Sequence, residues 1–132
     1  MNRTWLKSIL FVLLLQPTLQ AQTRAYAKFG RSGETVGLYN LMSQSSACGY
    51  RKVFEGVVSN FNSWKQGIEI DYRFAIDVGG GQRLFEFTLG VDDISQADIR
   101  DLISRRQRVR IRACRSRGRY WAAEEVTRAK TQ

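Results

Sequence analysis

The chain has 132 residues, of which 43% are hydrophobic, and a formal net charge of +9. Its content of aromatic and aliphatic residues excludes wholesale disorder, and its length fits one domain. Because the sequence contains no histidine, catalytic Ser-His or Cys-His pairs and histidine-based metal sites are excluded.

The N-terminus carries a short apolar segment. Two basic residues precede the run Ile9–Leu15, and small or polar residues follow it. This run is too short to cross a bilayer, which needs roughly 20 apolar residues, and no later segment is apolar enough to do so. The pattern predicts a secretory signal peptide over residues 1–21, with cleavage after Ala21; Ala25 and Ala27 together form a second, more distant small-x-small option. We therefore expect an exported protein, periplasmic or secreted.

The composition suggests where the folded domain begins. Residues 22–47 carry glycine and serine without a sustained period, so we interpret them as an N-terminal arm with one helical turn near Leu38–Met42. The folded domain is expected over residues 48–128, and residues 129–132 form a C-terminal tail.

Three strands are predicted first in this domain. Tyr50–Phe61 is the first, with Gly56 as a bulge or bend. Ile68–Val78 alternates apolar and polar residues over eleven positions, which is typical of a half-buried strand. Gly79–Gln82 supplies a hairpin turn, and residues 83–90 return as the partner strand.

A helix follows the hairpin. Ser95 and Asp98 have the spacing of a capping box, and Ile94 and Ile99 have the spacing of a hydrophobic staple. These signals predict a helix from about Gln96 to Arg106.

The basic character of the chain is local. Eight arginines lie between Arg105 and Arg119, and without them the net charge falls from +9 to +1. Within Arg108–Cys114 the arginines alternate with apolar residues, which predicts a strand with one buried face rather than a disordered tail. A glycine-containing turn follows, and Tyr120–Arg128 is the returning strand.

Five strands with one helix between the third and fourth predict a mainly β fold, the five-stranded OB-fold Greek-key barrel. In that fold the first strand pairs antiparallel with the fourth, which brings Cys48 to Cys114. We therefore predict one disulfide between them; the alternative is two free buried thiols. By strict alternation Cys114 lies on the arginine face, so either the bridge is external or a bulge intervenes.

The segments "ACGYRKV", "FAIDVGGGQRLFEF", "ISQADIRDLIS" and "RVRIRACRSRGRYWAAEEV" together resemble secreted OB-fold B subunits of bacterial toxins, most closely the Shiga-toxin type. Those subunits similarly have a Cys before the first strand and a Cys at the end of the fourth. The resemblance covers Cys48 to Arg128 and implies a pentameric ring that binds cell-surface glycans without catalysis.

OB domains often bind ligands with the loops that join strands one to two and four to five. Aromatic residues beside cations in these loops suit stacking on a sugar or base whose anionic group is held by arginine. The alternative is that the aromatic residues cap the core and the arginines are merely solvated. The candidate residues are Asn62, Trp64, Lys65, Arg115, Arg117, Arg119 and Tyr120; Trp121 points to the face opposite Tyr120, so one of these two belongs to the core.

Nucleic acid is the competing ligand for so basic a chain. The outward face of the second and third strands carries Glu69, Asp71, Asp77 and Glu86, which would repel phosphate. This outward face is acidic, whereas the outward face of the fourth strand is basic. Faces of opposite sign favour head-to-tail association into a homo-oligomeric ring; the alternative is a monomer with a dipolar surface.

The sequence therefore predicts an exported, non-enzymatic protein that binds glycans or acidic surface groups. The alternative is a periplasmic stand-alone OB-fold protein that binds an anionic ligand, nucleic acid or an envelope partner protein. We expect no cofactor, no metal site and no catalytic residues.

Overall fold

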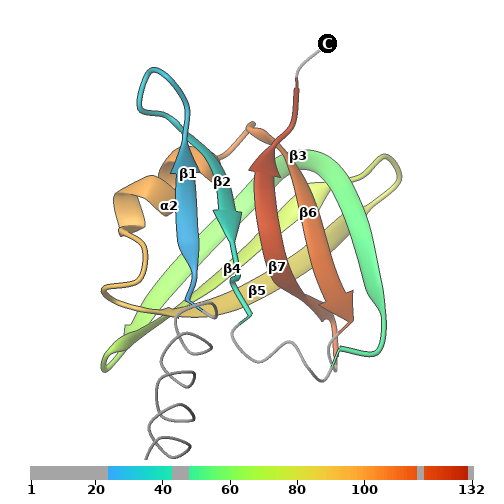
Figure 1. Cartoon of the computed structure of the whole chain (residues 1–132). Coiled ribbons are helices and arrows are strands. Elements are labelled where there is room, and N and C mark those ends of the chain that lie inside the picture. The colour runs from blue at the N-terminus through green and yellow to red at the C-terminus, as the bar shows by residue number, and fades with distance from the viewer. Residues whose placement is uncertain (1–23, 43–47, 116–117, 131–132) are drawn as a thin grey trace, which may run out of the picture.

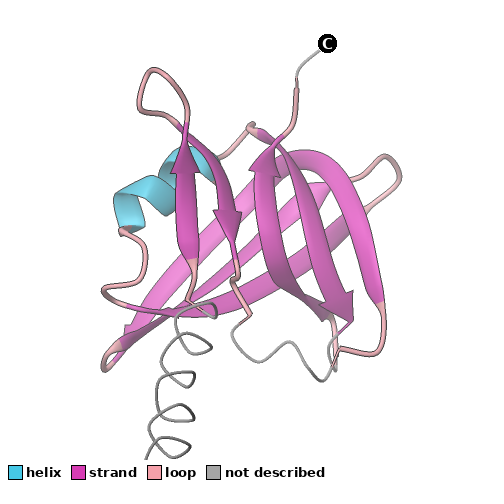
Figure 2. Ribbon diagram, viewed as in Figure 1, coloured by secondary structure: helices cyan, strands magenta, loops and turns pink. Residues whose placement is uncertain are grey.

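The computed structural model describes residues 24–42, 48–115 and 118–130, so the predicted signal peptide lies outside the described residues. In this part of the chain seven strands and one short helix are present, which confirms the mainly β class (Figures 1 and 2). The elements are β1 (Tyr26–Phe29), β2 (Thr35–Tyr39), β3 (Arg51–Gln66), β4 (Glu69–Asp77), β5 (Gln82–Gly90), α2 (Gln96–Leu102), β6 (Arg108–Arg115) and β7 (Tyr120–Arg128).

The β4–β5 hairpin forms where the alternation predicted it. Tyr72 and Phe74 of β4 are buried, and Phe85 of β5 is buried between them and the rest of the core. Gly79 and Gly80 have φ angles of 48° and 107°, which only glycine adopts readily, and so they close the turn.

β3 is long enough to pair with two different strands. Its first half pairs with β6 and its second half with β4, and Val57 is paired with both Asp77 and Arg108. A Cβ at Gly56 would overlap the carbonyl oxygen of Asp77, so the residue at this crossing must be glycine. The predicted bend at Gly56 thus corresponds to a close approach between two strands.

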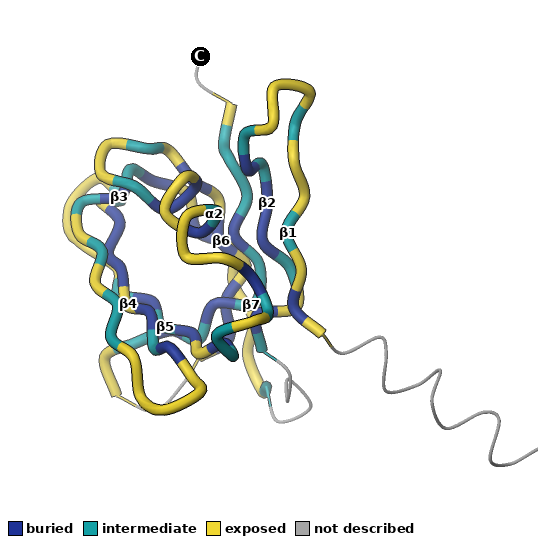
Figure 3. The backbone as a smooth tube through the Cα atoms, turned by 90° about the vertical axis from the view of Figure 1, so that its left-hand side faces the viewer, coloured by how far each residue is buried: buried dark blue, intermediate teal, exposed yellow. Residues whose placement is uncertain are grey.

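Five strands, β3 to β7, form a partial ring of pairings. Their order is β3, β4, β5, β7, β6 and back to β3. The β5–β7 contact is parallel and is limited to three residue pairs, whereas the other neighbours are antiparallel. Each of the five strands contributes buried residues to one hydrophobic core, and Figure 3 colours these buried positions dark blue.

α2 is shorter than predicted. Ser95 caps it, since its side chain accepts a hydrogen bond from the Asp98 backbone, but the helix ends at Leu102 rather than at Arg106. Arg106 has a φ of 75°, and its N–H donates to the carbonyl of Val58 at 2.9 Å. Pairing of this backbone with β3 therefore replaces the helical hydrogen bonds.

The helical turn predicted near Leu38–Met42 is wrong. Leu38 belongs to β2, which forms a hairpin with β1 and pairs with β7 through Gly37 and Leu38. The β7 edge satisfies the backbone groups of this segment and buries Leu38 completely, which a single helical turn could not do.

Arg128 of β7 joins this hairpin to the rest of the fold. It donates to the carbonyl of Thr35 at 2.9 Å and to Oε1 of Gln107 at 2.8 Å. The backbone N–H of Thr35 donates to Oδ2 of Asp101, at the end of α2, at 2.7 Å. One guanidinium group thus links β2, the helix and the strand ends.

The predicted disulfide between Cys48 and Cys114 is present, with a Cα–Cα distance of 5.8 Å. The antiparallel β3–β6 pairing places Arg51 opposite Cys114, which confirms the expected strand relationship. Cys114 is buried, and the β6–β7 register shifts by one residue between Arg112 and Ala113. A bulge therefore lies beside the cysteine.

Candidate functional site

The candidate site is a pocket of about 460 Å³ at one side of the ring. It lies where the starts of β3, β5 and β7 meet the end of β6. We call it the basic pocket, and it is lined by Lys52, Phe54, Gln82, Arg83, Leu84, Arg115, Arg119 and Trp121.

Strand register brings these residues together from distant parts of the sequence. Trp121 is paired with Phe85 on one side and with Arg115 on the other. The backbone N–H of Arg115 donates to the carbonyl of Tyr50 at 2.9 Å, which holds the end of β6 against the start of β3. Lys52 and Arg83 enter the pocket as early residues of β3 and β5.

Two of the cations lie over aromatic rings. The Lys52 ammonium is 5.2 Å from the ring centroid of Phe54, and Cζ of Arg115 is 5.1 Å from that of Trp121. Phe54 and Trp121 contact each other edge to face, with centroids 4.8 Å apart. Both rings are almost fully buried, so they support the cations from below rather than offering an open stacking surface.

The charged side chains that line the basic pocket are all positive. Four exposed cations line it, and no Asp or Glu does so among the described residues. A cleft lined by like charges concentrates the field and attracts counter-ions of the opposite sign. Arginine also binds carboxylate, sulfate or phosphate with two parallel hydrogen bonds. The pocket is therefore suited to an anionic group.

The predicted residues of the second loop fall partly in this pocket. Arg115 and Arg119 line it, whereas Arg117 lies outside the described residues. Lys52 and Arg83 were missed by the sequence reasoning. The predicted antiparallel pairing of the first and fourth strands could have identified Lys52. This pairing sets Lys52 opposite Ala113, two positions before Arg115, and so brings Lys52 near Arg115.

The predicted residues of the first loop do not join the pocket. Asn62, Trp64 and Lys65 belong to β3, which continues to Gln66, so their placement in a loop is wrong. Pairing with β4 keeps them in the strand, with Trp64 opposite Asp71 and Lys65 opposite Ile70. The turn itself contains Gly67, whose φ is 64°.

Trp64 and Tyr120 both contact the exposed Arg73 of β4 instead. Both rings contact the guanidinium group of Arg73, whose Cζ is 4.9 Å from the Trp64 centroid and 4.6 Å from the Tyr120 centroid. Arg73 also forms an ion pair with Glu86 at 3.4 Å. The two aromatic residues thus hold an arginine of the protein, and Trp121 rather than Tyr120 is the one in the core.

The predicted acidic face is partly neutralised by these contacts. Asp71 accepts a hydrogen bond of 2.6 Å from Thr88, and Glu86 faces Arg73. A groove of about 380 Å³ crosses this face between the segment Leu41–Met42 and Ala122. Its charges are mixed, so it is less selective for an anion than the basic pocket.

Tyr72 of β4 is buried in the core of the ring. Burial in the core raises the pKa of Tyr72, and the positive charge of Arg100 opposes part of that rise. The phenol is therefore neutral at physiological pH.

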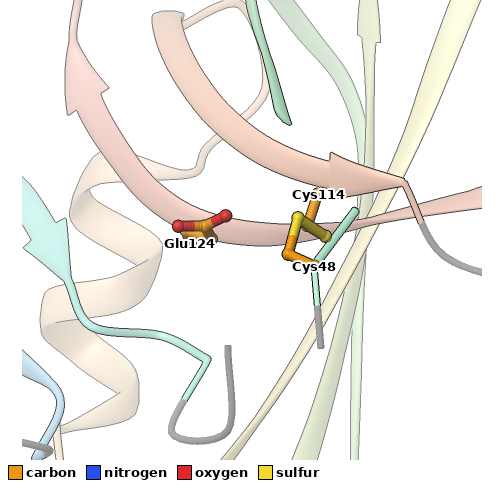
Figure 4. A group of neighbouring side chains, drawn as sticks. All are labelled: Cys48, Cys114 and Glu124. Atoms are coloured by element: carbon orange, nitrogen blue, oxygen red, sulfur yellow. A yellow bond between two sulfur atoms is a disulfide. The ribbon is translucent and has the colours of Figure 1, made fainter. Parts of the chain in front are cut away.

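Cys48, Cys114 and Glu124 lie within 4.8 Å of one another, a spacing that could suit a metal ion (Figure 4). The two sulfur atoms are bonded to each other, and so neither is a thiolate ligand. Glu124 is engaged by Nε of Arg51 at 2.8 Å. These residues therefore form a covalent and ionic link between β3, β6 and β7.

Within the described part of the chain, no helix has the length and apolar character needed to span a membrane. No family model matches the sequence, and no curated protein or solved structure matches the chain. Function is therefore inferred from the geometry.

Proposed function

We propose that the chain is an exported, non-enzymatic OB-fold protein that binds an acidic glycan in the basic pocket. The observation that carries the proposal is the set of four cations, Lys52, Arg83, Arg115 and Arg119, without a lining carboxylate among the described residues. Such a site recognises sulfate or carboxylate groups on a sugar by charge-assisted hydrogen bonds.

The strand pairings support the OB-fold part of the proposal. The ring order, the parallel contact between β5 and β7, and the position of the helix between β5 and β6 all agree with that architecture. OB-folds bind oligosaccharides and oligonucleotides, and the resemblance to toxin B subunits favours the glycan. The disulfide is consistent with export, because disulfides persist in oxidising compartments.

Calorimetric titration tests the proposal directly. A sulfated disaccharide prepared from heparin is compared with a neutral disaccharide and with a short oligothymidylate, at about 50 and about 200 mM salt. We expect the sulfated sugar to bind and the neutral sugar not to bind. Preferential binding of the oligothymidylate with a steep salt dependence would favour the nucleic-acid alternative.

A pair of variants ties binding to the pocket. Arg83→Gln removes one pocket cation and should weaken binding by about tenfold or more. Arg110→Gln removes the same charge from the outward face of β6 and should leave the affinity within about twofold. Equal losses in both variants would mean that only the total charge of the protein matters, which contradicts a built site.

Assembly into a ring of identical subunits is a separate proposal. Arg110 and Arg112 are exposed on the outer face of β6, opposite in sign to Glu69 and Asp77, which are exposed on β4. Association between these faces would be head to tail. Native mass measurement at low and high salt checks it, since a monomer under both conditions contradicts the ring.

A further inference from the structure

We infer that the ligand is a linear polyanionic glycan that runs from the basic pocket, across Gln82, into a second pocket beside α2. The inference rests on the proposed function and extends it from one anionic group to a chain. The second pocket, called the helix pocket, has a volume of about 660 Å³ and is lined by Ser59, Asn60, Phe61, Gln82, Arg100, Ile103, Ser104 and Arg105.

The two pockets meet at Gln82, which lines both. Its side-chain amide donates to Oγ of Ser59 at 3.1 Å and to Oδ1 of Asp77 at 3.3 Å. These bonds fix the residue at the junction and engage the nearby carboxylate. Gln82 is exposed, so the junction is open to solvent.

The charged residues that line the two pockets are all positive. The basic pocket contributes four cations and the helix pocket adds Arg100 and Arg105, which makes six. Neither pocket is lined by Asp or Glu among the described residues. A path with cations in both of its pockets matches a ligand with repeated negative charges.

The length of the path requires a chain. Lys52 of the basic pocket and Ser59 of the helix pocket are seven positions apart in β3, a contour of about 23 Å. One sugar ring is far shorter than this distance. A ligand that fills both pockets, from Lys52 to Ser59, therefore spans several sugar units.

The aromatic residues favour a glycan over single-stranded nucleic acid. Proteins that bind single strands stack the bases on exposed aromatic rings. Here Phe54 and Trp121 are 7% and 8% exposed, and Phe61 is half-buried. The path instead offers Ser59, Asn60 and Ser104, whose polar groups can bond to sugar hydroxyls.

Length-dependent binding tests the inference with the full folded chain. Heparin-derived disaccharide and octasaccharide are titrated against the wild-type protein by calorimetry. We expect the octasaccharide to bind at least about tenfold more tightly. If each disaccharide unit of the octasaccharide bound only as tightly as the free disaccharide, the path would be overturned but the proposed function would stand. If neither sugar bound, the path and the proposed function would both be overturned.

Matched variants locate the second half of the path. The double variant Arg100→Gln with Arg105→Gln should lose at least about tenfold in octasaccharide affinity and keep its disaccharide affinity. The control is Lys28→Gln with Arg31→Gln, which removes the same charge from the exposed β1–β2 hairpin, outside both pockets. Equal octasaccharide losses in both pairs overturn the inference, as does tighter binding of an oligothymidylate of equal charge. Thermal melting verifies that each variant is folded.

Discussion

The guanidinium group of Arg115 lies over the indole ring of Trp121, with Cζ 5.1 Å from the ring centroid. The indole is buried between β5 and β6, and the arginine is exposed at the end of β6. The indole ring therefore holds the charge of Arg115 in place at the pocket. Arg115 then loses less conformational entropy when a ligand binds than an unrestrained side chain would lose.

Replacement of Arg115 should separate charge from geometry. Arg115→Ala should weaken binding of the sulfated disaccharide by about ten- to a hundredfold, because a charge-assisted contact is lost. Arg115→Lys keeps the positive charge but loses the planar guanidinium group. The affinity of this variant should therefore fall between those of the wild-type protein and Arg115→Ala. Calorimetry measures both, with Arg112→Ala as the control on the same strand; a lysine variant equal to wild type would contradict the planar contact.

The crossing at Gly56 predicts a sharp effect on stability. Gly56→Ala places a Cβ against the carbonyl oxygen of Asp77, so the strands must separate, and unfolding should become easier by about 1–3 kcal/mol. Urea denaturation measures this change. Gly49→Ala is the control because its Cβ would have no neighbour within 4 Å. Equal stability of the two variants would show that β3 and β4 can part without cost.

These positions show what the sequence could and could not predict. Alternation predicted the β4–β5 hairpin, β6 and β7, because one face of each strand is buried and the period is local. The disulfide followed from the pairing of strands one and four. β1 and β2 were not predicted, since residues 24–42 carry little periodicity and are held by the edge of β7.

The candidate site was predicted only in part for the same reason. Arg115 and Arg119 lie in a conspicuous basic run, but Lys52 and Arg83 are single charges at strand starts. Lys52 and Arg83 reach the same pocket as Arg115 and Arg119 only because the strands close into a ring. Nothing in the sequence next to either residue indicates this long-range relationship. Trp64 and Tyr120 were expected to stack on a ligand beside the loop cations, whereas in the structure both rings contact the guanidinium group of Arg73.

Arg128 should be important for the attachment of the β1–β2 hairpin. Arg128→Ala removes its bonds to Thr35 and Gln107 and should cost about 2–3 kcal/mol of stability. Limited proteolysis should then cut within residues 24–42 before the rest of the chain. The control is Arg110→Ala, on the neighbouring strand. A hairpin that stays resistant in the Arg128 variant would show that the pairing with β7 is sufficient.

The disulfide should contribute substantially to stability. The double variant Cys48→Ser with Cys114→Ser frees a long loop, for which the chain-entropy relation gives about 4 kcal/mol. Urea denaturation of the variant and of the reduced wild-type protein should show similar losses. No loss in either would mean that the loop is already restrained by other contacts.

The raised pKa of Tyr72 predicts a dependence of stability on alkaline pH. The folded pKa is higher than the unfolded value of about 10, so its contribution is complete below pH 10 and is lost as the pH rises through the folded pKa. Tyr72→Phe should therefore lose less stability than wild type between about pH 10 and 12. Denaturation across this range measures it, with Tyr26→Phe at an exposed tyrosine as the control; parallel curves for Tyr72→Phe and wild type would contradict the shift.

The disulfide between Cys48 and Cys114 also affects the basic pocket. It joins the segment before Lys52 to the residue before Arg115, so two of the four pocket cations stand next to its ends. In a reducing compartment only non-covalent contacts, among them the β3–β6 pairing, hold these ends together against the mutual repulsion of the four charges. Under the proposed function, oxidation of the two cysteines therefore strengthens the basic pocket for its ligand, and an oxidising compartment favours binding.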